Sequence, residues 1–310
     1  MNFQSSSKDN MEKVLVITGQ TASGKTSISK EIAKKVNGEI INGDAMQVYK
    51  ELSIITDKPD VSSRFDIPHH LFDIKSIEED YSVKEYQQNI RKVITEVTNR
   101  GHLPIIVGGT GLYIKAALYD YNFIDEDIDN EKESHRFDDL TNDELYQKLQ
   151  EIDPDACNSI HPNNRKRVIR AILINKASKK TKSEIIKEQE HVLIYDAIVI
   201  SLAMDKELSI QKMDERIDKM FEEGAVDEVK NNKTTKTASK AIGYPEITAY
   251  LEGKTTLEEA KELMKIHTHQ YAKRQRTWQR NQIKAIFVDS KDKKKAIDEI
   301  YSIINDKWKM

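Results

Sequence analysis

The stretch that decides the fold is Val14-Leu-Val-Ile-Thr-Gly-Gln-Thr-Ala-Ser-Gly-Lys-Thr26. Its first five residues are mostly apolar and β-branched and lead to a glycine, which is typical of a buried strand. Gly19 to Thr26 then fits G-x-x-x-x-G-K-[ST], a loop that cradles phosphates with backbone N–H groups and a helix N-terminus. Lys25 supplies a cation for a terminal phosphate, and Thr26 supplies a hydroxyl for Mg²⁺. The motif also occurs in nucleotide-binding and ATP-binding proteins, so it predicts a phosphate site without naming the phosphate compound.

Helices and further strands alternate after this stretch. Ile28 and Ile32 lie four residues apart, as on one face of a helix, and Ser82 with Glu85 forms the sequence of a capping box before a helix that we expect to end at Arg100-Gly101. The further expected strands are residues 39–41, 104–107, 197–202 and 285–288. Strand, helix and strand in this order imply parallel pairing with right-handed crossovers. The sequence therefore predicts an α/β fold with a P-loop NTPase-like parallel sheet flanked by helices.

The pattern changes between about residues 120 and 190. Acidic residues crowd Asp125–Asp139, Thr141–Glu144 offers a second capping box, and the helical segments that follow are rich in lysine and arginine. No strand pattern occurs in this region. We therefore expect a catalytic core built from residues 11–120 plus 191–310 and a small all-helical insertion domain at residues 121–190.

Composition limits the classes of protein to consider. The 310 residues are 33% charged and 38% hydrophobic, as in a soluble globular protein. No apolar run approaches the roughly 18–20 residues that cross a bilayer, and the polar start, Met1–Lys13, reads as a disordered tail without the apolar core of a signal peptide. We expect no membrane partner. Cys157 is the only cysteine, so an intrachain disulfide is impossible and the cytoplasm is the simplest location.

Polar loops follow two of the predicted strands, where a parallel sheet binds its ligands. In Asn42-Gly-Asp-Ala-Met-Gln-Val-Tyr49, Asp44 could bind Mg²⁺, accept a proton or cap the next helix. In Val107-Gly-Gly-Thr-Gly-Leu-Tyr113, Thr110 offers a hydroxyl and a first-turn amide, although a tight turn without function would also explain the segment. Both loops are candidate site segments.

The pair His69-His70, close to Asp73, raises the question of a metal site. Adjacent histidines seldom point the same way on regular structure, and no third or fourth ligand lies at a typical spacing. We therefore expect a packed or hydrogen-bonded turn at this position.

Two segments gather positive charge in a chain whose net charge is −3. Asn163-Asn-Arg-Lys-Arg-Val-Ile-Arg170 carries four cations on one expected helix, and Lys273-Arg-Gln-Arg-Thr-Trp-Gln-Arg280 joins four cations to a tryptophan. Solvated helix faces are the usual explanation. Stacking on bases and contacts with phosphates would need the same residues, so we expect these segments to form two walls that clamp an RNA.

Taken together, these blocks resemble the tRNA dimethylallyltransferase family, also called tRNA isopentenyltransferases. The resemblance extends from Gly19 to about Arg280. It includes the phosphate loop, GDAMQVYK, IPHHLFDI, GGTGLYI, IHPNNRKRVIRA, AIGY and YAKRQRTW. The phosphate loop occurs in many families, whereas GGTGLY and KRQRTW at this separation are far more particular.

The resemblance implies a reaction. The phosphate loop would bind the diphosphate of dimethylallyl diphosphate, and Asp44 matches the general base that takes a proton from the exocyclic amine of adenine. Thr110 and Arg216 match residues that help to bind the diphosphate as it leaves. The acceptor would be the adenosine immediately 3′ of the anticodon, in the anticodon stem-loop of a tRNA, and the base must leave its stack to reach a buried carboxylate. Mg²⁺ is the expected cofactor, and a monomer the expected state.

The site residues expected from these motifs fall into two groups. The residues expected to bind the diphosphate are Gly19, Thr21, Ala22, Ser23, Gly24, Lys25 and Thr26. Contacts with tRNA are expected from Asp44, Ala45, Met46 and Gln47, from Lys166, Arg167 and Arg170, and from Lys273, Arg274, Gln275, Arg276, Trp278 and Arg280.

Some positions depart from the family pattern. Gln20 stands where proline is common, Ala45 replaces a usual serine, and Ile55-Thr-Asp-Lys-Pro59 stands for the more typical G-T-A-K-P. Further departures are Lys212, Pro245 and Gln279. Since none of them removes a proposed catalytic group, they concern affinity and the choice of tRNA more than the class of reaction.

Three other functions fit parts of the sequence. An isopentenyltransferase acting on free AMP, ADP or ATP would need the same core but would have little use for the two cationic segments. A small-molecule kinase would use the loop for ATP and transfer a phosphoryl group. A non-catalytic RNA-binding protein would not need Lys25, Thr26, Asp44 and Arg216 together.

Overall fold

The computed structural model describes residues 11–121, 123, 133–188 and 192–310. Residues 1–10 of the expected disordered tail and residues 125–132 of the acidic stretch lie outside this range, whereas Lys13, the last residue of the expected tail, is the first residue of a strand. Contacts divide the chain into two compact units, Met1–Tyr119 with Leu193–Met310 (unit 1) and Asp120–Val192 (unit 2).

Unit 1 is built on one six-stranded sheet in which every pairing is parallel, in the order β3-β2-β4-β1-β5-β6. The strands are β1 (Lys13–Gly19), β2 (Gly38–Asn42), β3 (His69–His70), β4 (Leu103–Val107), β5 (Asp196–Ala203) and β6 (Ile286–Asp289). The predicted parallel α/β sheet is therefore confirmed, and each of the five predicted strands lies at the expected place.

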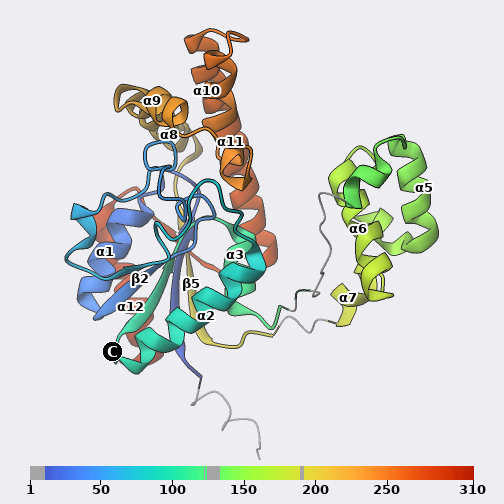
Figure 1. Ribbon diagram of the computed structural model, residues 1–310. Coiled ribbons are helices and arrows are strands. Elements are labelled where there is room, and N and C mark those ends of the chain that lie inside the picture. The colour runs from blue at the N-terminus through green and yellow to red at the C-terminus, as the bar shows by residue number, and fades with distance from the viewer. Residues whose placement is uncertain (1–10, 122, 124–132, 189–191) are drawn as a thin grey trace, which may run out of the picture. The chain divides into compact units, whose positions relative to one another are not determined.

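Alternating side chains of the central strand β1 pack on opposite faces of the sheet. Val14 and Val16 belong to one apolar cluster, and Leu15 and Ile17 to another. The first cluster is covered by α2 (Val83–Asn99) and α3 (Gly111–Leu118), and the second by α1 (Lys25–Lys35) and α12 (Lys293–Trp308), as Figure 1 shows. Because both faces are buried, β1 is a continuous apolar run.

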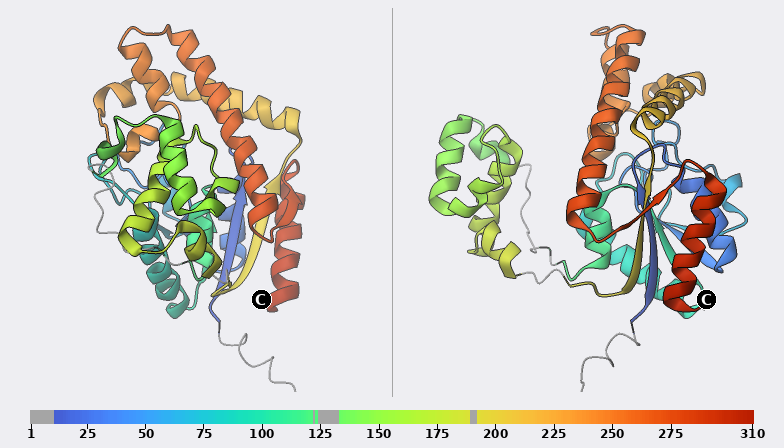
Figure 2. Two further views of the ribbon diagram at one scale, coloured as in Figure 1. Left: turned by 90° about the vertical axis from the view of Figure 1, so that its right-hand side faces the viewer. Right: turned by 180° about the vertical axis from the view of Figure 1, so that it is seen from behind.

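Four helices of unit 1 lie beyond the carboxyl ends of the strands or extend from there. They are α8 (Lys206–Glu222), α9 (Ala225–Asn231), α10 (Tyr244–Leu251) and the 26-residue α11 (Leu257–Gln282). In both views of Figure 2, α11 runs from this end back along the sheet. It therefore reaches the loops that follow the strands.

Unit 2 contains helices and no strand among its described residues. Its helices are α5 (Asn142–Ile152), α6 (Arg165–Ser178) and α7 (Lys182–Glu188). The predicted capping box at Thr141 and Glu144 is complete, with each side chain bonded to the other residue's backbone N–H. Leu145 and Leu149 of α5 pack with Val168 and Ile172 of α6 in a separate core.

The Ser82 capping box is only half formed. The Ser82 hydroxyl accepts a hydrogen bond from the Glu85 backbone N–H at 3.1 Å, as predicted. The Glu85 carboxylate lies 3.0 Å from Lys75 Nζ, so it forms an ion pair with this lysine. The helix begins at the expected residue because the serine alone satisfies one of its first amides.

Two predictions about secondary structure were wrong or incomplete. His69-His70 is a short edge strand rather than a turn, because its backbone pairs with Ile40 and Ile41 of β2. The prediction of hydrogen bonding was correct, since His70 Nε2 lies 2.6 Å from Glu39 Oε2. The sequence reading also ended with the last strand and missed α12, whose Ile297, Ile300, Ile304 and Trp308 are buried at helical spacing.

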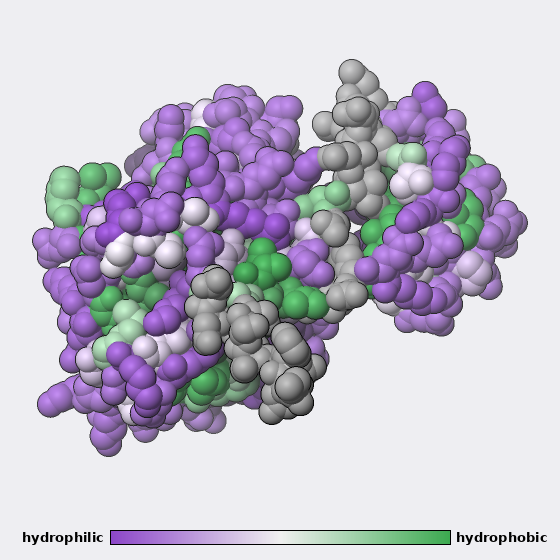
Figure 3. Space-filling view, turned by 90° about the horizontal axis from the view of Figure 1, so that it is seen from below, coloured by the Kyte–Doolittle hydropathy of each residue, from purple (hydrophilic) through white to green (hydrophobic). Residues whose placement is uncertain are grey.

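The surface agrees with a chain rich in charge. Hydrophilic residues dominate the face seen in Figure 3, and the hydrophobic residues there form small separate patches. Among the described residues, no helix is both long enough and apolar enough to cross a membrane.

Candidate active site

The phosphate loop has the context that its motif requires, between β1 and α1. Gly24 adopts φ +84° directly before α1, a left-handed conformation that a side chain would strain. Lys25 turns its ammonium back onto the loop and donates to the carbonyl oxygens of Gly19 at 3.1 Å and Gln20 at 2.7 Å. The first turn of α1 carries no acidic residue and no side-chain cap, and its residues Lys25, Thr26 and Ser27 line the cavity, so its amides are available to an anion there.

The charge of Lys25 is unusually costly in this position. Burial, together with the nearby Arg216 guanidinium, lowers its pKa to about 8, although the carboxylates of Asp44 and Asp57 act in the opposite direction. Two cations that repel each other in a partly desolvated loop form a site that binds an anion. Lys25 therefore fits its predicted contact with a phosphate.

Asp44 is fixed by backbone contacts at the end of β2. The fully buried Asn42 accepts from the Asp44 N–H at 2.8 Å and donates to the Asp44 carbonyl oxygen at 3.0 Å. Asp44 Oδ1 accepts from the Met46 N–H at 2.9 Å. No described helix begins here, so the alternative that Asp44 caps the next helix was wrong, and its carboxylate instead ties a turn at the cavity wall.

Thr110 joins the loop after β4 to the loop after β2. Its hydroxyl accepts a hydrogen bond from the Ala45 N–H at 3.1 Å, and its backbone N–H donates to the carbonyl oxygen of Gly43 at 3.3 Å. As the residue before α3, Thr110 does not cap that helix with its side chain. Thr110 therefore links two loops of the candidate site, and its role in binding diphosphate stays a prediction.

Arg216 comes from α8, almost two hundred residues after the phosphate loop, and reaches that loop. Its Nη1 hydrogen-bonds to the Thr21 hydroxyl, and its Nε lies 3.1 Å from Asp57 Oδ2. The guanidinium thus lies beside the phosphate loop, where a leaving diphosphate would develop negative charge.

These residues line one cavity of about 590 Å³. Its polar wall contains Lys25, Thr26, Asp44, Thr110 and Arg216. Its apolar wall is formed by Ile55, Met213, Ile217, Met220, Ile242 and Met264. Such a volume is typical of sites for small organic ligands. Positive charge, a carboxylate and apolar surface therefore line the same cavity.

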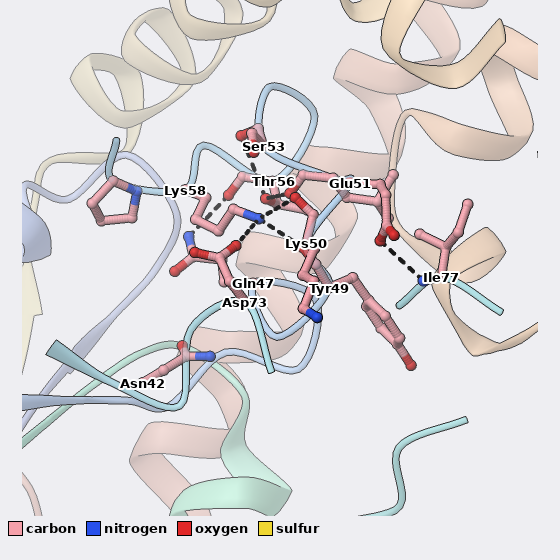
Figure 4. Close-up of polar contacts among 12 residues, drawn as sticks. Asn42, Gln47, Tyr49, Lys50, Glu51, Ser53, Thr56, Lys58, Asp73 and Ile77 are labelled. Atoms are coloured by element: carbon pink, nitrogen blue, oxygen red, sulfur yellow. Dashed lines mark hydrogen bonds and ion pairs between the residues drawn. The ribbon is translucent and has the colours of Figure 1, made fainter. Parts of the chain in front are cut away.

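The segment between Asp44 and Pro59 is held by a buried lysine (Figure 4). Lys58 Nζ donates to the carbonyl oxygens of Tyr49 at 2.6 Å and Lys50 at 3.1 Å, and it lies 2.6 Å from Asp73 Oδ1. Gln47, which the sequence analysis assigned to tRNA binding, donates to the Thr56 carbonyl oxygen at 3.0 Å. Lys58 and Asp73, both in motifs of the resemblance, therefore brace the loop that carries Asp44.

Three side chains of α11 bond to the phosphate loop and its neighbours. Gln275 is buried: its Oε1 accepts from the Thr21 N–H at 3.0 Å, and its Nε2 donates to Gly109 O at 3.0 Å. Arg276 Nη1 donates to Gln20 Oε1 at 3.0 Å, and Gln279 accepts from the Ser201 hydroxyl at 3.0 Å. Gln275 and Arg276 have these internal partners because their face of α11 packs on the site, and their expected contact with tRNA stays a prediction.

Trp278 is also directed inward. A Cβ on Gly111 would lie 2.3 Å from the indole, so the ring packs directly on that glycine. Of the two roles open to Trp278, packing and stacking on bases, the structure shows packing. Lys273, Arg274 and Arg280 are exposed on other faces of the same helix. The expected contact of these three exposed cations with tRNA stays a prediction.

Unit 2 presents its own cations on α6. Lys166, Arg167 and Arg170 are exposed, whereas Arg165 donates to the carbonyl oxygen of Leu140 at 2.6 Å and is structural. Burial lowers the pKa of Lys182, and the neighbouring Arg167 and Arg170 lower it further against the opposite effect of Asp153. Positive charge is therefore concentrated around this end of α6.

Tyr271 is a site residue that the sequence analysis missed. It lines the cavity beside Asp44, and its hydroxyl is in hydrogen-bonding contact with Thr110 and Gln275. Burial, reinforced by the Asp44 carboxylate, raises its pKa to about 12, so the hydroxyl stays neutral near pH 7. Its place on α11, two helical turns after Met264 and one turn before Gln275, was the available signal.

Among the described residues, no group of three or more His, Cys, Asp or Glu side chains could hold a metal ion. His70, one of the two adjacent histidines, contacts Glu39. Thr26, Asp44 and Asp57 nevertheless place oxygen donors around one cavity. Mg²⁺ favours oxygen donors and usually completes its shell with substrate phosphates and water.

Comparison with known proteins now identifies the family. The family model described as IPP transferase matches residues 47–282. The chain belongs to the IPP transferase family. A tRNA dimethylallyltransferase of Anoxybacillus flavithermus is 44% identical over 304 residues, covering 96% of this chain and 97% of that protein. A tRNA dimethylallyltransferase of Bacillus licheniformis is 44% identical over 283 residues, covering 89% and 90%.

Solved structures of IPP transferases have the same fold. A tRNA delta(2)-isopentenylpyrophosphate transferase from Staphylococcus epidermidis superimposes with a TM-score of 0.71 at 37% identity, over 95% of this chain and 99% of that chain. A eukaryotic dimethylallyltransferase acting on tRNA gives a TM-score of 0.83 at 32% identity, over 95% and 79%. The predicted family resemblance is confirmed.

Proposed function

We propose that this IPP transferase moves a dimethylallyl group from dimethylallyl diphosphate to the N6 amine of the adenosine 3′ of a tRNA anticodon, releasing diphosphate. One observation carries the proposal: the phosphate loop, the Asp44 carboxylate and an apolar wall share a single cavity. A five-carbon prenyl group needs apolar surface beside the diphosphate, whereas phosphoryl transfer itself requires only positioning and positive charge. The names of the relatives and of the matching structures support tRNA as the acceptor.

The diphosphate is assigned to the polar wall of the cavity. The α1 amides, Lys25 and the Arg216 guanidinium supply positive charge there, and the Thr26 hydroxyl lines the same wall. This charge stabilises the transition state because negative charge grows on the leaving diphosphate. Gln275 holds the Thr21 N–H, so it positions the loop rather than the ligand.

The prenyl group is assigned to the apolar wall. Met213, Ile217 and Met220 lie on one side of α8, and Met264 faces the same cavity from α11. A five-carbon chain has only apolar surface, and burying it beside these side chains is favourable by about 25 cal/mol per Å². Methionines adapt their shape, so this wall can close around a small branched chain.

Asp44 is assigned as the general base. The adenine N6 attacks the first carbon of the prenyl group, the carbon–oxygen bond to diphosphate breaks with its electron pair on oxygen, and the Asp44 carboxylate accepts the proton from the amine. Asn42 and Met46 hold Asp44 on both sides. These hydrogen bonds hold the Asp44 carboxylate in place before the adenine binds.

Mg²⁺ is assigned to the same polar wall. Thr26, which lines the cavity, would hold it together with diphosphate oxygens and water. When bound, the ion would neutralise charge on the leaving group.

The tRNA is assigned to the exposed cations of each unit, Lys166, Arg167 and Arg170 in unit 2 and Lys273, Arg274 and Arg280 in unit 1. Ala45 and Met46 line the cavity beside Asp44 and are expected to contact the target nucleotide. We place the reaction in the cytoplasm, where tRNA is used, and expect the protein to act as a monomer.

The test is mass analysis of unmodified tRNA after incubation with the protein, Mg²⁺ and dimethylallyl diphosphate. We expect a gain of one C5 prenyl unit on an anticodon-loop adenosine and release of diphosphate. Parallel reactions with AMP, ADP or ATP as acceptor should give no product. Prenylation of free nucleotide in place of tRNA, or ADP formation coupled to product, would overturn the proposal.

A further inference from the structure

Asp57 places an extra carboxylate at the donor cavity. Asp57 lies in the segment Ile55-Thr-Asp-Lys-Pro59, between the turn that carries Asp44 and Pro59. The Asp57 side chain is 62% exposed and lines the cavity, and its Oδ2 lies 3.1 Å from Arg216 Nε. A negative charge therefore lies next to a cation assigned to the diphosphate.

The loop, rather than the ion pair, holds Asp57 in place. Its backbone adopts φ +51°, a left-handed conformation that aspartate and asparagine tolerate better than most residues. Its N–H donates to the Ile54 carbonyl oxygen at 3.0 Å, and its own carbonyl oxygen accepts from Gln47 Nε2 at 3.2 Å. The carboxylate is thus presented to the cavity by a tight turn.

The contact with Arg216 is an ion pair without a well-aligned hydrogen bond. Arg216 Nε is buried and has no hydrogen-bond partner, although Asp57 Oδ2 is within ion-pair distance. The guanidinium directs Nη1 to Thr21 instead. The same carboxylate also favours the positive charge of Lys25, which lines the same cavity. Asp57 thus offsets the charge of both cations without a strong bond to either.

We propose that the Asp57 carboxylate competes with the diphosphate for the positive charge of Arg216 and Lys25. When the site holds no anion, its carboxylate partly neutralises Arg216 and Lys25. When a diphosphate is bound, the same carboxylate repels it, so the ligand binds more weakly and the diphosphate product leaves more readily. The inference rests on the proposed donor site.

The size of the effect is limited by solvent. An exposed carboxylate at the rim acts through water as well as protein, so its repulsion is screened and depends on salt. A diphosphate carries several negative charges, which multiplies the small contribution of each pair of charges. We therefore expect removal of the charge to tighten diphosphate binding by about 3- to 10-fold at low salt.

The experiment is a calorimetric titration of the full chain with inorganic diphosphate, with and without Mg²⁺. Asp57→Asn keeps the size of the side chain and tolerates the left-handed backbone, so it removes only the charge. Its Kd should fall by the stated factor, and the difference from wild type should shrink as salt rises. In steady-state assays the KM for dimethylallyl diphosphate should fall, and inhibition by product diphosphate should strengthen.

The matched control is Asp66→Asn. Asp66 lies in the same stretch of chain, pairs with Lys34 at 3.4 Å and is 79% exposed, away from the cavity lining. Its loss removes the same net charge from the protein and should leave the Kd for diphosphate unchanged. An equal gain in both variants would show an effect of overall charge and would overturn the proposal.

Other outcomes are equally decisive. Equal or weaker diphosphate binding by Asp57→Asn would show that Asp57 has no effect or holds Arg216 in its binding position, and either result overturns the proposal. Weaker binding only with Mg²⁺ present would make Asp57 a metal ligand and would also overturn it. Failure of the wild-type protein to bind diphosphate at all would instead contradict the proposed donor site, and this inference with it.

Discussion

At the scale of single residues, Asp44 is the group on which the proposed chemistry depends. Asn42 bonds to both its N–H and its carbonyl oxygen, so an asparagine in place of Asp44 would keep the same backbone and lose only the ability to accept a proton. Asp44→Asn should lower the single-turnover rate by about 10²–10⁴-fold, the usual range for loss of a general base. Rapid quench with saturating tRNA measures this rate, and tRNA affinity in the same samples should be unchanged. A near-normal single-turnover rate would show that Asp44 is not the general base and only holds the turn.

Lys25 makes a pH-dependent prediction at the same scale. Its pKa in the free protein is about 8, and a bound diphosphate favours the protonated form and raises that pKa. Diphosphate affinity should therefore be full below pH 8, fall as pH rises above 8, and be accompanied by proton uptake near pH 8. Titrations in buffers of different ionisation enthalpy measure the uptake. The Lys25→Met variant should bind diphosphate more weakly and should show no proton uptake from this side chain. A wild-type affinity for diphosphate that does not depend on pH would contradict the assignment of Lys25 to the diphosphate.

At the scale of elements, α11 connects the cationic surface to the phosphate loop. Gln275 accepts from the Thr21 N–H and donates to Gly109 O, so one side chain positions two loops of the site. Gln275→Met keeps the volume but removes the partner of the half-buried Thr21 N–H and of the buried Gly109 carbonyl oxygen, and a buried group left without a partner costs about 1–3 kcal/mol. We expect the Kd for diphosphate to rise by about 10-fold or more, with little change in tRNA affinity.

The control for this element is Gln270→Met, on the same helix. Gln270 is exposed, so its replacement should change neither ligand's affinity by more than about 2-fold, the usual scale for a surface substitution. Thermal unfolding of both variants separates a local change in the loop from loss of the fold. Unchanged diphosphate binding in a folded Gln275→Met protein would show that the phosphate loop holds its shape without α11.

At the scale of the whole molecule, binding of tRNA should depend on the exposed cations of both units. Each phosphate contact releases counterions, so affinity should fall steeply with salt. The double variant Arg167→Ala with Arg274→Ala should bind all tRNA substrates more weakly and with a flatter salt dependence, while the Kd for diphosphate stays the same. Filter binding at several salt concentrations measures the slope.

A second double variant provides the control for that slope. Lys293→Ala with Lys294→Ala removes two exposed cations from the start of α12, outside both cationic segments. It should keep the wild-type slope, since loss of net positive charge alone does not remove a phosphate contact. Identical slopes for the wild type and both double variants would show that these cations are only solvated helix faces.

Local sequence determined much of this protein. The phosphate loop, the parallel sheet and the caps at Ser82 and Thr141 were all predictable, because each depends on a few neighbouring residues and a fixed period. The adjacency of Asp44 and Thr110 also followed, since the carboxyl ends of parallel strands meet at one edge of the sheet. These features need no information about distant contacts.

Only the tertiary structure decided which side chains of a charged helix face the site. Lys273 and Arg276 belong to one run of cations, yet Lys273 is exposed and Arg276 bonds to Gln20, because the close packing of Trp278 on Gly111 sets how α11 is rotated. The edge strand at His69 depends likewise on pairing with β2, twenty-nine residues away. Such contacts join residues far apart in the chain, and their energy comes from shape and burial that no local pattern records.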